Sequence, residues 1–337
     1  MIYWFDGFDQ NTALSNYNQS TNCQITTTHA RTGIQCMNNF GGTLYKGFPV
    51  SLVTGIVGSA VYLTAYENNG SLVTPLGLGS GASPLLVPGI NNVGQLYVSY
   101  NGAGPSSPAG GVLSPVSIPL NQYHYVELVG TIGGAGTGSA TIYLDGIPVV
   151  SITGQSFGSV QINSIVCIGS NQFIDDIYFA DTSGGAPWNA PLGNAAVVTQ
   201  FPSASGSFTQ WTPIPGTNKN WQNVDSLTPS PGTVYNKSSA SGNRDSFVYS
   251  PSFPPAGLPA YQQIIAMMVQ EYGQSDSAGP CAVQLINRQA GVDNNSSNIN
   301  LGVGSAYGYA IFELDVNSGL WLASNLNATE SGYLRTI

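Results

Sequence analysis

Apolar and polar residues alternate at every second position over much of this chain. The clearest runs span 59–66, 94–100, 123–129, 140–144, 147–152 and 173–179. A period of two is typical of β-strands that bury one face, because successive side chains point to opposite sides of a strand. The 42 glycines and 21 prolines are spread along the whole length, which suits many short strands joined by tight turns. We therefore predict an all-β protein.

Three segments refine this picture. Asp145-Gly146 separates two of the runs and predicts a tight hairpin, because glycine adopts the positive φ of a type I′ turn. The segment 260–272 fits either a helix, since Met and Gln are good helix formers, or a strand that forms a long hairpin with 281–286. The turn-forming residues 276–279 favour the hairpin. Residues 324–330 are the one predicted helix, with Ser324 as its N-cap.

The alternation is interrupted at 184–194. This segment, GGAPWNAPLGN, has no periodicity and contains two prolines. A length of 337 residues is also enough for about two domains. We predict a first domain at 1–184, a linker at 185–194 and a second β-rich, sandwich-like domain at 195–337.

Composition excludes several classes of function. Charged residues make up 7% of the sequence, whereas about 25% is typical of soluble proteins. The net charge is −9, and the 7 basic residues are scattered, so no basic stripe exists to follow a nucleic-acid backbone. The longest apolar run, 52–63, is too short to cross a bilayer, and the first residues do not resemble a signal peptide. We expect a folded protein made in a cytoplasm, with no nucleic-acid partner and no membrane insertion.

The first domain resembles a concanavalin-A-like or laminin-G-like jelly roll. The resemblance rests on the opening FDGFD (5–9), the central YHYVEL and SATIYLDGIPVV segments (123–128 and 139–150) and the closing FIDDIYFAD (173–181). It implies that the last strand of the domain lies beside the first. Residues from about 190 to 337 are similar to the domain that follows such a sandwich in phage virion proteins. The matching features are Trp211, NWQNVD (220–225), GNRDSF (242–247) and the ending FELDVNSGLW (312–321) and ESGY (330–333).

Together these resemblances imply a structural component of a tailed-phage particle. A tail fibre or tail appendage involved in assembly or host attachment is favoured over a capsid decoration, cement or head-fibre protein. A carbohydrate-binding, lectin-like module is the second alternative. The expected partners are copies of the chain, other virion proteins and host-surface carbohydrate, and the expected location is the virion, after synthesis in the host bacterial cytoplasm.

The sequence offers little for catalysis, and we expect no enzyme. Sandwich glucanases place three acidic residues on one face of a strand, and two of them act as the catalytic pair. The nearest match here is Glu313 and Asp315, with a serine in place of the third acid. We therefore expect Glu313 and Asp315 to be solvent-facing strand residues. His29 and His124 have no nucleophile motif near them. The glycine-rich segment 133–138 lacks the Lys-Ser/Thr of a phosphate-binding loop and predicts a hairpin turn instead.

No metal or cofactor is expected either. Asp175-Asp176 is the best calcium candidate, but alternation along a strand sends the two side chains to opposite faces, so hydrogen bonds to neighbouring loops are favoured. Cys23 and Cys36 could meet across a hairpin, although reduced thiols are preferred. The five tryptophans could stack on sugar rings, but most are expected to pack internally; they are Trp4, Trp188, Trp211, Trp221 and Trp321.

Overall fold

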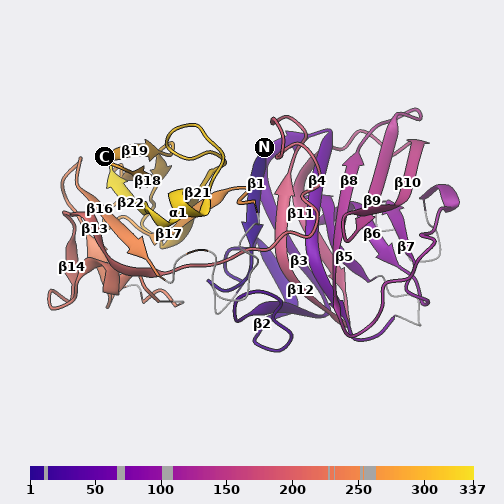
Figure 1. The fold of residues 1–337 in the computed structure, drawn as a ribbon, viewed down its shortest axis with the longest axis horizontal. Helices are drawn as coiled ribbons and strands as arrows, with labels where there is room; N and C mark the ends of the chain where they lie inside the picture. Colours follow the sequence, from indigo (N-terminus) through magenta and orange to yellow (C-terminus); the bar gives the residue numbers. More distant parts are fainter. Residues whose placement is uncertain are drawn as a thin grey trace. The chain divides into compact units, whose positions relative to one another are not determined.

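The computed structural model describes residues 1–10, 14–66, 73–100, 109–226, 228–230, 232–250, 253 and 263–337. Its described residues form two compact units, Met1–Thr199 (unit 1) and Gln200–Ile337 (unit 2) (Figure 1). The predicted linker at 185–194 lies within unit 1. The fold is all-β, as the alternation predicted. No helix in the described part of the chain has the length and apolar character needed to cross a membrane.

The described residues of unit 1 form twelve antiparallel strands and one short 3-10 helix. They are β1 (Ile2–Asp6), β2 (Gln19–Thr26), β3 (Cys36–Leu52), β4 (Thr54–Leu63), β5 (Thr74–Ser80), β6 (Ser83–Ile90), β7 (Leu96–Tyr100), η1 (Ala109–Gly111), β8 (Tyr123–Thr131), β9 (Gly138–Leu144), β10 (Ile147–Gln155), β11 (Ile162–Gly169) and β12 (Gln172–Ala180).

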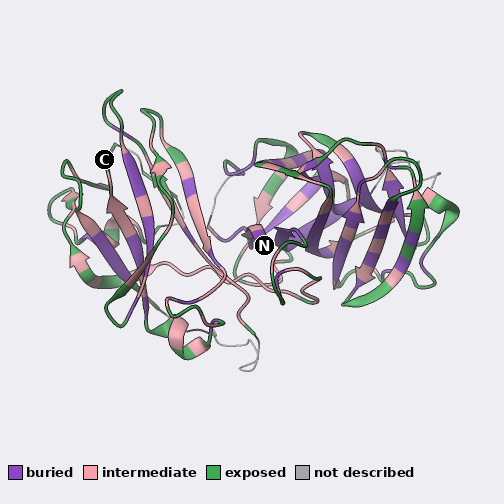
Figure 2. Ribbon diagram, turned by 90° about the horizontal axis from the view of Figure 1, so that it is seen from above, coloured by how far each residue is buried: buried purple, intermediate pink, exposed green. Residues whose placement is uncertain are grey.

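The strands of unit 1 fold into a jelly-roll sandwich. One layer has the order β1-β12-β4-β8-β9-β10 and the other β2-β3-β11-β5-β6-β7. The long strand β3 connects the layers, because it pairs with β12 near its start and with β11 further along. Side chains such as Val57, Leu78, Leu86 and Leu128 are fully buried, and each stabilises the unit by roughly 1.5–3 kcal/mol. The buried residues concentrate along these strands (Figure 2).

Two specific predictions for unit 1 are confirmed. The last strand β12 pairs with the first strand β1, with Trp4 opposite Phe179 and Asp6 opposite Ile177. Asp145 and Gly146 join β9 to β10 with φ values of 51° and 80°, as a type I′ turn requires.

Unit 2 is a smaller sandwich-like β unit. Its main sheet has the order β13-β16-β22-β18-β19, with β20 also paired to β18, and two ribbons, β14–β15 and β17–β21, accompany it. Val269, Leu285, Phe312 and Trp321 form one cluster of its buried core. The elements are β13 (Pro202–Thr209), β14 (Thr212–Ile214), η2 (Asn220–Asn223), β15 (Tyr235–Lys237), β16 (Arg244–Tyr249), β17 (Met267–Gly273), β18 (Ala282–Gln289), β19 (Val292–Asn295), β20 (Ile299–Asn300), β21 (Ala306–Phe312), α1 (Ala323–Asn327) and β22 (Thr329–Arg335).

The structure corrects two expectations in unit 2. Residues 267–273 form a strand, but its partner is β21 and not the segment 281–286, which instead pairs with β19, β20 and β22. Residues 260–262 of the predicted element lie outside the described part of the chain. The helix is shorter than predicted, 323–327, and its N-cap is Leu322 and not Ser324, without a capping side-chain hydrogen bond.

Candidate functional site

Three aromatic residues form a row across adjacent strands of unit 1. Tyr62 on β4 lies directly opposite Tyr123 on β8 and Phe173 on β12. The ring centroids of Tyr62 and Tyr123 are 5.5 Å apart, and those of Tyr62 and Phe173 are 6.0 Å apart. Directly opposed side chains in an antiparallel sheet share a face, so the register alone brings these rings together.

His29 completes this group, which we call the aromatic cluster (His29, Tyr62, Tyr123 and Phe173). Its ring stacks on Tyr62 at a centroid distance of 4.2 Å and meets Phe173 edge-on at 4.6 Å. His29 has a φ of 62° in the segment between β2 and β3, and the Tyr123 hydroxyl donates to its carbonyl oxygen. His29 is exposed, Tyr62 and Tyr123 are half-buried, and Phe173 is buried beneath them.

The same face of the sheet carries two further rows of side chains next to the aromatic cluster. Asp175 and Tyr125 flank Ala60 in the first, and Tyr178 and Glu127 flank Gly58 in the second. Glycine is required at 58, because a Cβ atom there would lie 2.3 Å from the Tyr178 ring. The rows therefore place carboxylates and phenols side by side on what we call the outer face.

A β-bulge adds a second carboxylate to the outer face. The register shifts between Asp175 and Tyr178, and Asp176 adopts a φ of 48°. Asp175 accepts the Arg31 backbone N–H at 2.8 Å, while Asp176 accepts the Thr32 hydroxyl at 2.5 Å and forms an ion pair with Arg31. The prediction that alternation separates Asp175 from Asp176 is therefore wrong, because the bulge interrupts the alternation and both side chains hold the same loop.

Residues 192–197, which we call the strap, cover part of this face. The backbone N–H groups of Leu192 and Gly193 donate to Glu127 Oε1 at 2.8 and 3.1 Å. The Val197 N–H donates to Asp176 Oδ1 at 2.7 Å, and Arg31 Nη1 donates to the Ala195 carbonyl at 2.7 Å. The segment after β12 is thereby fastened to the sheet.

Burial controls the charge of these acids. It raises the pKa of Asp175 to about 8, with the neighbouring Asp176 adding to the effect. Burial also raises the pKa of Asp176, although the positive charge of Arg31 acts in the opposite direction. It raises the pKa of Glu127 as well, although the Tyr178 hydroxyl donates a 2.5 Å hydrogen bond that lowers it. Glu127 Oε2 is buried and has no hydrogen-bond partner among the described residues. A protonated carboxyl suits this environment, because an isolated buried charge is costly.

Metal binding gains no support from this arrangement. The oxygens of Asp175 and Asp176 are occupied by Arg31, Thr32, Val197 and the Asp176 N–H itself. Within the described ranges, no three His, Cys, Asp or Glu side chains gather in a way that could hold a metal ion.

The other candidate residues lie apart from the outer face. His124 Nδ1 lies 2.7 Å from Asp145 Oδ2, at one end of the sheet. Residues 133–138 form the turn between β8 and β9. Asp315 was expected to face solvent on a strand, but it is buried after the end of β21 and accepts the N–H groups of Asn317 and Gly319. Glu313 also lies beyond β21 and is half-buried.

The cysteines and tryptophans have structural positions. Across β2 and β3, Cys23 lies opposite Asn39 and Cys36 opposite Thr26, so the two thiols do not face each other. The prediction of internal packing is confirmed for Trp4, Trp188 and Trp321, which are buried. The sequence search for an aromatic platform considered tryptophans and therefore missed the aromatic cluster of His29, Tyr62, Tyr123 and Phe173.

Comparisons with known proteins do not identify a family for this chain. No protein-family model and no curated protein sequence matches the chain. Among solved structures it is similar to the cellulose-induced protein Cip1, with a TM-score of 0.40 and 14% identity over 57% of this chain and 100% of that one. It is also similar to an endo-beta-1,4-glucuronan lyase from Trichoderma reesei (TM-score 0.39, 12% identity, 53% of this chain, 95% of that one). A third is a Trypanosoma rangeli sialidase (TM-score 0.33, 18% identity, 47% of this chain, 26% of that one).

These neighbours correct the expectation that the chain is not an enzyme. The solved structures to which this chain is similar include a lyase and, over 26% of its length, a sialidase, so the exclusion of enzymes was wrong. The physical reason is that the motif search examined residues close together in the sequence. The sheet instead brings Glu127 of β8 beside Tyr178 of β12, a pairing that no linear motif reveals. At these identities the likeness concerns the fold alone.

Proposed function

We propose that this chain is a structural component of a tailed-phage particle, a tail fibre or tail appendage, that attaches to neutral carbohydrate through unit 1. The observation that carries the attachment role is the aromatic cluster. His29 presents an exposed ring supported from below by Tyr62 and Phe173. A rigid aromatic face of this kind attracts the C–H groups of a sugar ring, because the face of an aromatic ring is electron-rich. The assignment to a phage particle rests on the sequence resemblance of both domains.

The distribution of charge supports a neutral ligand. Of the 16 acidic and 7 basic residues in the sequence, 8 acidic side chains and one basic side chain are buried among the described residues. The exposed surface is therefore poorer in charge than the composition suggests. Such a surface offers hydrogen bonds and ring faces in place of the basic groups that acidic ligands require.

Glycan binding is tested with the full chain on an array of neutral and acidic glycans, comparing wild type with His29→Ala. Because one aromatic contact is worth about 0.5–1.5 kcal/mol, the substitution should weaken binding to the best neutral glycan by about two- to tenfold. His124→Ala is the matched control, since this second histidine lies outside the aromatic cluster. Equal binding by wild type and His29→Ala would contradict the role of the cluster.

The particle assignment is tested separately. An antibody against the full chain should label purified phage particles of the same genome in electron micrographs, on the tail. Labelling of the capsid would favour a decoration or head-fibre protein. A glycan-binding chain that never co-sediments with particles would favour a free lectin-like module and overturn the virion assignment.

A further inference from the structure

The exposed ring of the aromatic cluster is carried by an irregular segment and not by a strand. Residues 27–35, which we call the His29 loop, connect β2 to β3. Backbone N–H groups outside a sheet need acceptors from elsewhere. Four N–H groups of the His29 loop donate to the side chains of two buried aspartates, Asp9 and Asp175. The position of His29 therefore depends on these acids.

Asp9 holds the second half of the His29 loop. Its Oδ1 accepts the N–H groups of Ile34 and Gln35 at 2.7 and 2.9 Å, and the residue is 4% exposed. Gly33 lies against the same carboxyl group with a φ of 61°, and a Cβ atom at this position would lie 1.7 Å from Asp9 Oδ2. The backbone of the loop is thus fitted closely around Asp9.

Asp175 and Asp176 hold the first half of the His29 loop. Asp175 Oδ2 accepts the N–H groups of Arg31 and Thr32 at 2.8 and 3.3 Å. Asp176 accepts the Thr32 hydroxyl and forms an ion pair with Arg31, whose guanidinium keeps its charge at any ordinary pH. Three buried carboxyl groups therefore contact the loop, and Arg31 is the cation paired with them.

The docked loop favours protonation of these acids. Burial raises the pKa of Asp9 from 3.8 to about 6, and that of Asp175 to about 8, with Asp176 adding to both effects. In a released loop water would reach the carboxyl groups and return each pKa toward its ordinary value. The docked loop thus retains protons that a released loop loses, so docking weakens as the pH rises from about 4 through 6 and 8. For Asp9 alone, about two pKa units change the ratio of docked to released loop about a hundredfold.

The other titratable groups around the three acids preserve this sign. Burial raises the pKa values of Cys36 on β3 and of Tyr123 and Tyr125 on β8, so these groups stay neutral. Asp6 on β1 lies near Asp9, and burial raises its pKa to about 6 as well. Lys46, which faces Asp6, has its pKa lowered to about 8 by burial. Raising the pH therefore adds negative charge and removes positive charge on this side of the loop.

We propose that Asp9, Asp175 and Asp176 are positioning residues of the carbohydrate site, which hold the His29 ring in place at acidic pH and release it at alkaline pH. Release of the loop is a property of unit 1 alone, whereas its effect on a glycan rests on the proposed function. A site that is formed in only a fraction of the molecules binds more weakly by that fraction. Glycan binding should accordingly weaken as the pH rises.

Release of the loop is measured by hydrogen exchange of the full chain, with mass spectrometry of peptides that cover 27–35. Exchange is corrected for the intrinsic effect of pH. Protection of this segment should fall about a hundredfold between pH 5 and pH 8.5, while protection of β4 changes little. Constant protection of 27–35 over this range would overturn the inference.

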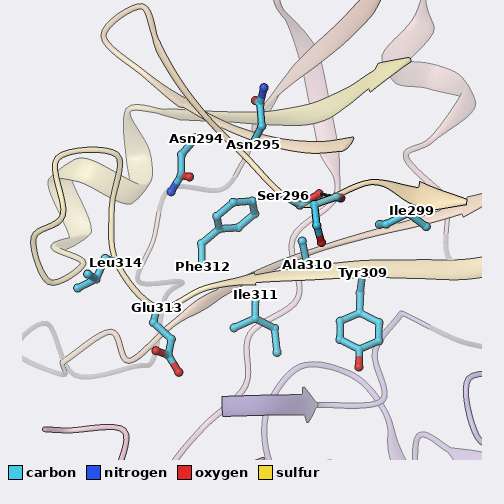
Figure 3. A pocket seen from close by; sticks show the side chains of 11 residues that line it. Asn294, Asn295, Ser296, Ile299, Tyr309, Ala310, Ile311, Phe312, Glu313 and Leu314 are labelled. Atoms are coloured by element: carbon cyan, nitrogen blue, oxygen red, sulfur yellow. Dashed lines mark hydrogen bonds between the residues drawn. The ribbon is translucent and has the colours of Figure 1, made fainter. Parts of the chain in front are cut away.

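Variants separate the pH effect from a purely structural role of Asp9. Asp9→Asn keeps an oxygen acceptor for the loop but cannot ionise, so the fall in protection should be at least tenfold smaller than in wild type. Asp9→Ala removes the acceptor and should lower protection of 34–35 at every pH. Glu313→Gln is the matched control with the wild-type profile, because this acid belongs to unit 2, where Figure 3 shows it pointing away from Phe312. An unchanged fall in Asp9→Asn would overturn the role of Asp9.

The effect on binding is measured with the neutral glycan that binds best on the array, at pH 5 and pH 8.5. Because histidine rings titrate near neutral pH, the measurement includes His29→Phe, which keeps a ring that cannot ionise. Binding should weaken at least tenfold at pH 8.5 in wild type and in His29→Phe, and less in Asp9→Asn. Binding by His29→Phe that is equally strong at both pH values would overturn the inference alone. Absence of glycan binding, together with pH-dependent protection of 27–35, would contradict the proposed function alone.

Discussion

Glu271 offers a direct test of how unit 2 tolerates a buried acid. It lies on β17, and its carboxyl group fits against Gly308 of the paired strand β21, where a Cβ atom would lie 2.8 Å from Oε1. The Glu271 carboxyl group also lies close to Gly273. The apolar side chains of Ile299, near Gly308, and Leu301, near Gly273, surround it. Oε1 is buried without a hydrogen-bond partner among the described residues. Burial raises the pKa of Glu271 from 4.5 to about 7.

The sign and the size of the effect follow from this shift. Below pH 4.5 the carboxyl group is protonated in both the folded and the unfolded chain, so it does not favour either state. Between pH 4.5 and 7 the unfolded chain releases the proton while the folded chain retains it, and the free energy of unfolding falls as the pH rises. At about 1.4 kcal/mol per pKa unit, the loss reaches about 3 kcal/mol above pH 7.

The assay is urea unfolding of wild type and Glu271→Gln between pH 4.5 and pH 8, followed by tryptophan fluorescence. The stability difference between the two proteins should change by about 3 kcal/mol across this range in favour of the variant, because glutamine does not ionise. Glu330→Gln is an informative contrast. Glu330 accepts the Ser207 N–H at 2.7 Å and hydrogen bonds from serine hydroxyls, which hold its pKa below its usual range, so that variant should lose stability at neutral pH. A pH-independent difference for Glu271→Gln would refute the reasoning.

Two further predictions concern the strap and the core of unit 2. Glu127→Ala removes the acceptor of the Gly193 N–H and leaves the Leu192 N–H only its longer hydrogen bond to the Tyr178 hydroxyl. The variant should therefore accelerate cleavage by subtilisin between residues 185 and 199, whereas Glu313→Ala should leave the cleavage rate unchanged. Trp321, which is 2% exposed, donates from Nε1 to the Phe312 carbonyl at 2.8 Å. Trp321→Ala should therefore lower the free energy of unfolding of unit 2 by about 3–5 kcal/mol in urea, and the exposed neighbour Leu322→Ala should change it little.

Much of the fold followed from local patterns. Alternation located six strands of unit 1, namely β4, β7, β8, β9, β10 and β12. The Asp-Gly pair fixed one hairpin. Both signals reside in a few neighbouring residues. The pairing of β17 could not be predicted in this way. Its partner β21 lies beyond three intervening strands, and nothing in the sequence of 267–273 distinguishes that partner from the nearer segment 281–286.

The candidate sites were harder to predict than the strands. Tyr62, Tyr123 and Phe173 each occupy an ordinary strand position, and only the register of β4 with β8 and β12 aligns them in one row. The bulge at Asp176 was equally hidden, because a non-glycine residue with a positive φ has no strong sequence signal.

Several of the few acidic side chains in this chain are buried, where they accept hydrogen bonds from backbone N–H groups. Asp9 accepts the N–H groups of Ile34 and Gln35, Asp175 those of Arg31 and Thr32, and Asp315 those of Asn317 and Gly319. Irregular segments cannot pair their N–H groups within a sheet, and the oxygens of a buried carboxyl group supply the missing acceptors. Carboxylates used in this way no longer contribute to the surface. What remains outside is rich in amides, hydroxyls and ring faces, the groups that bind neutral hydroxylated ligands by hydrogen bonding and stacking.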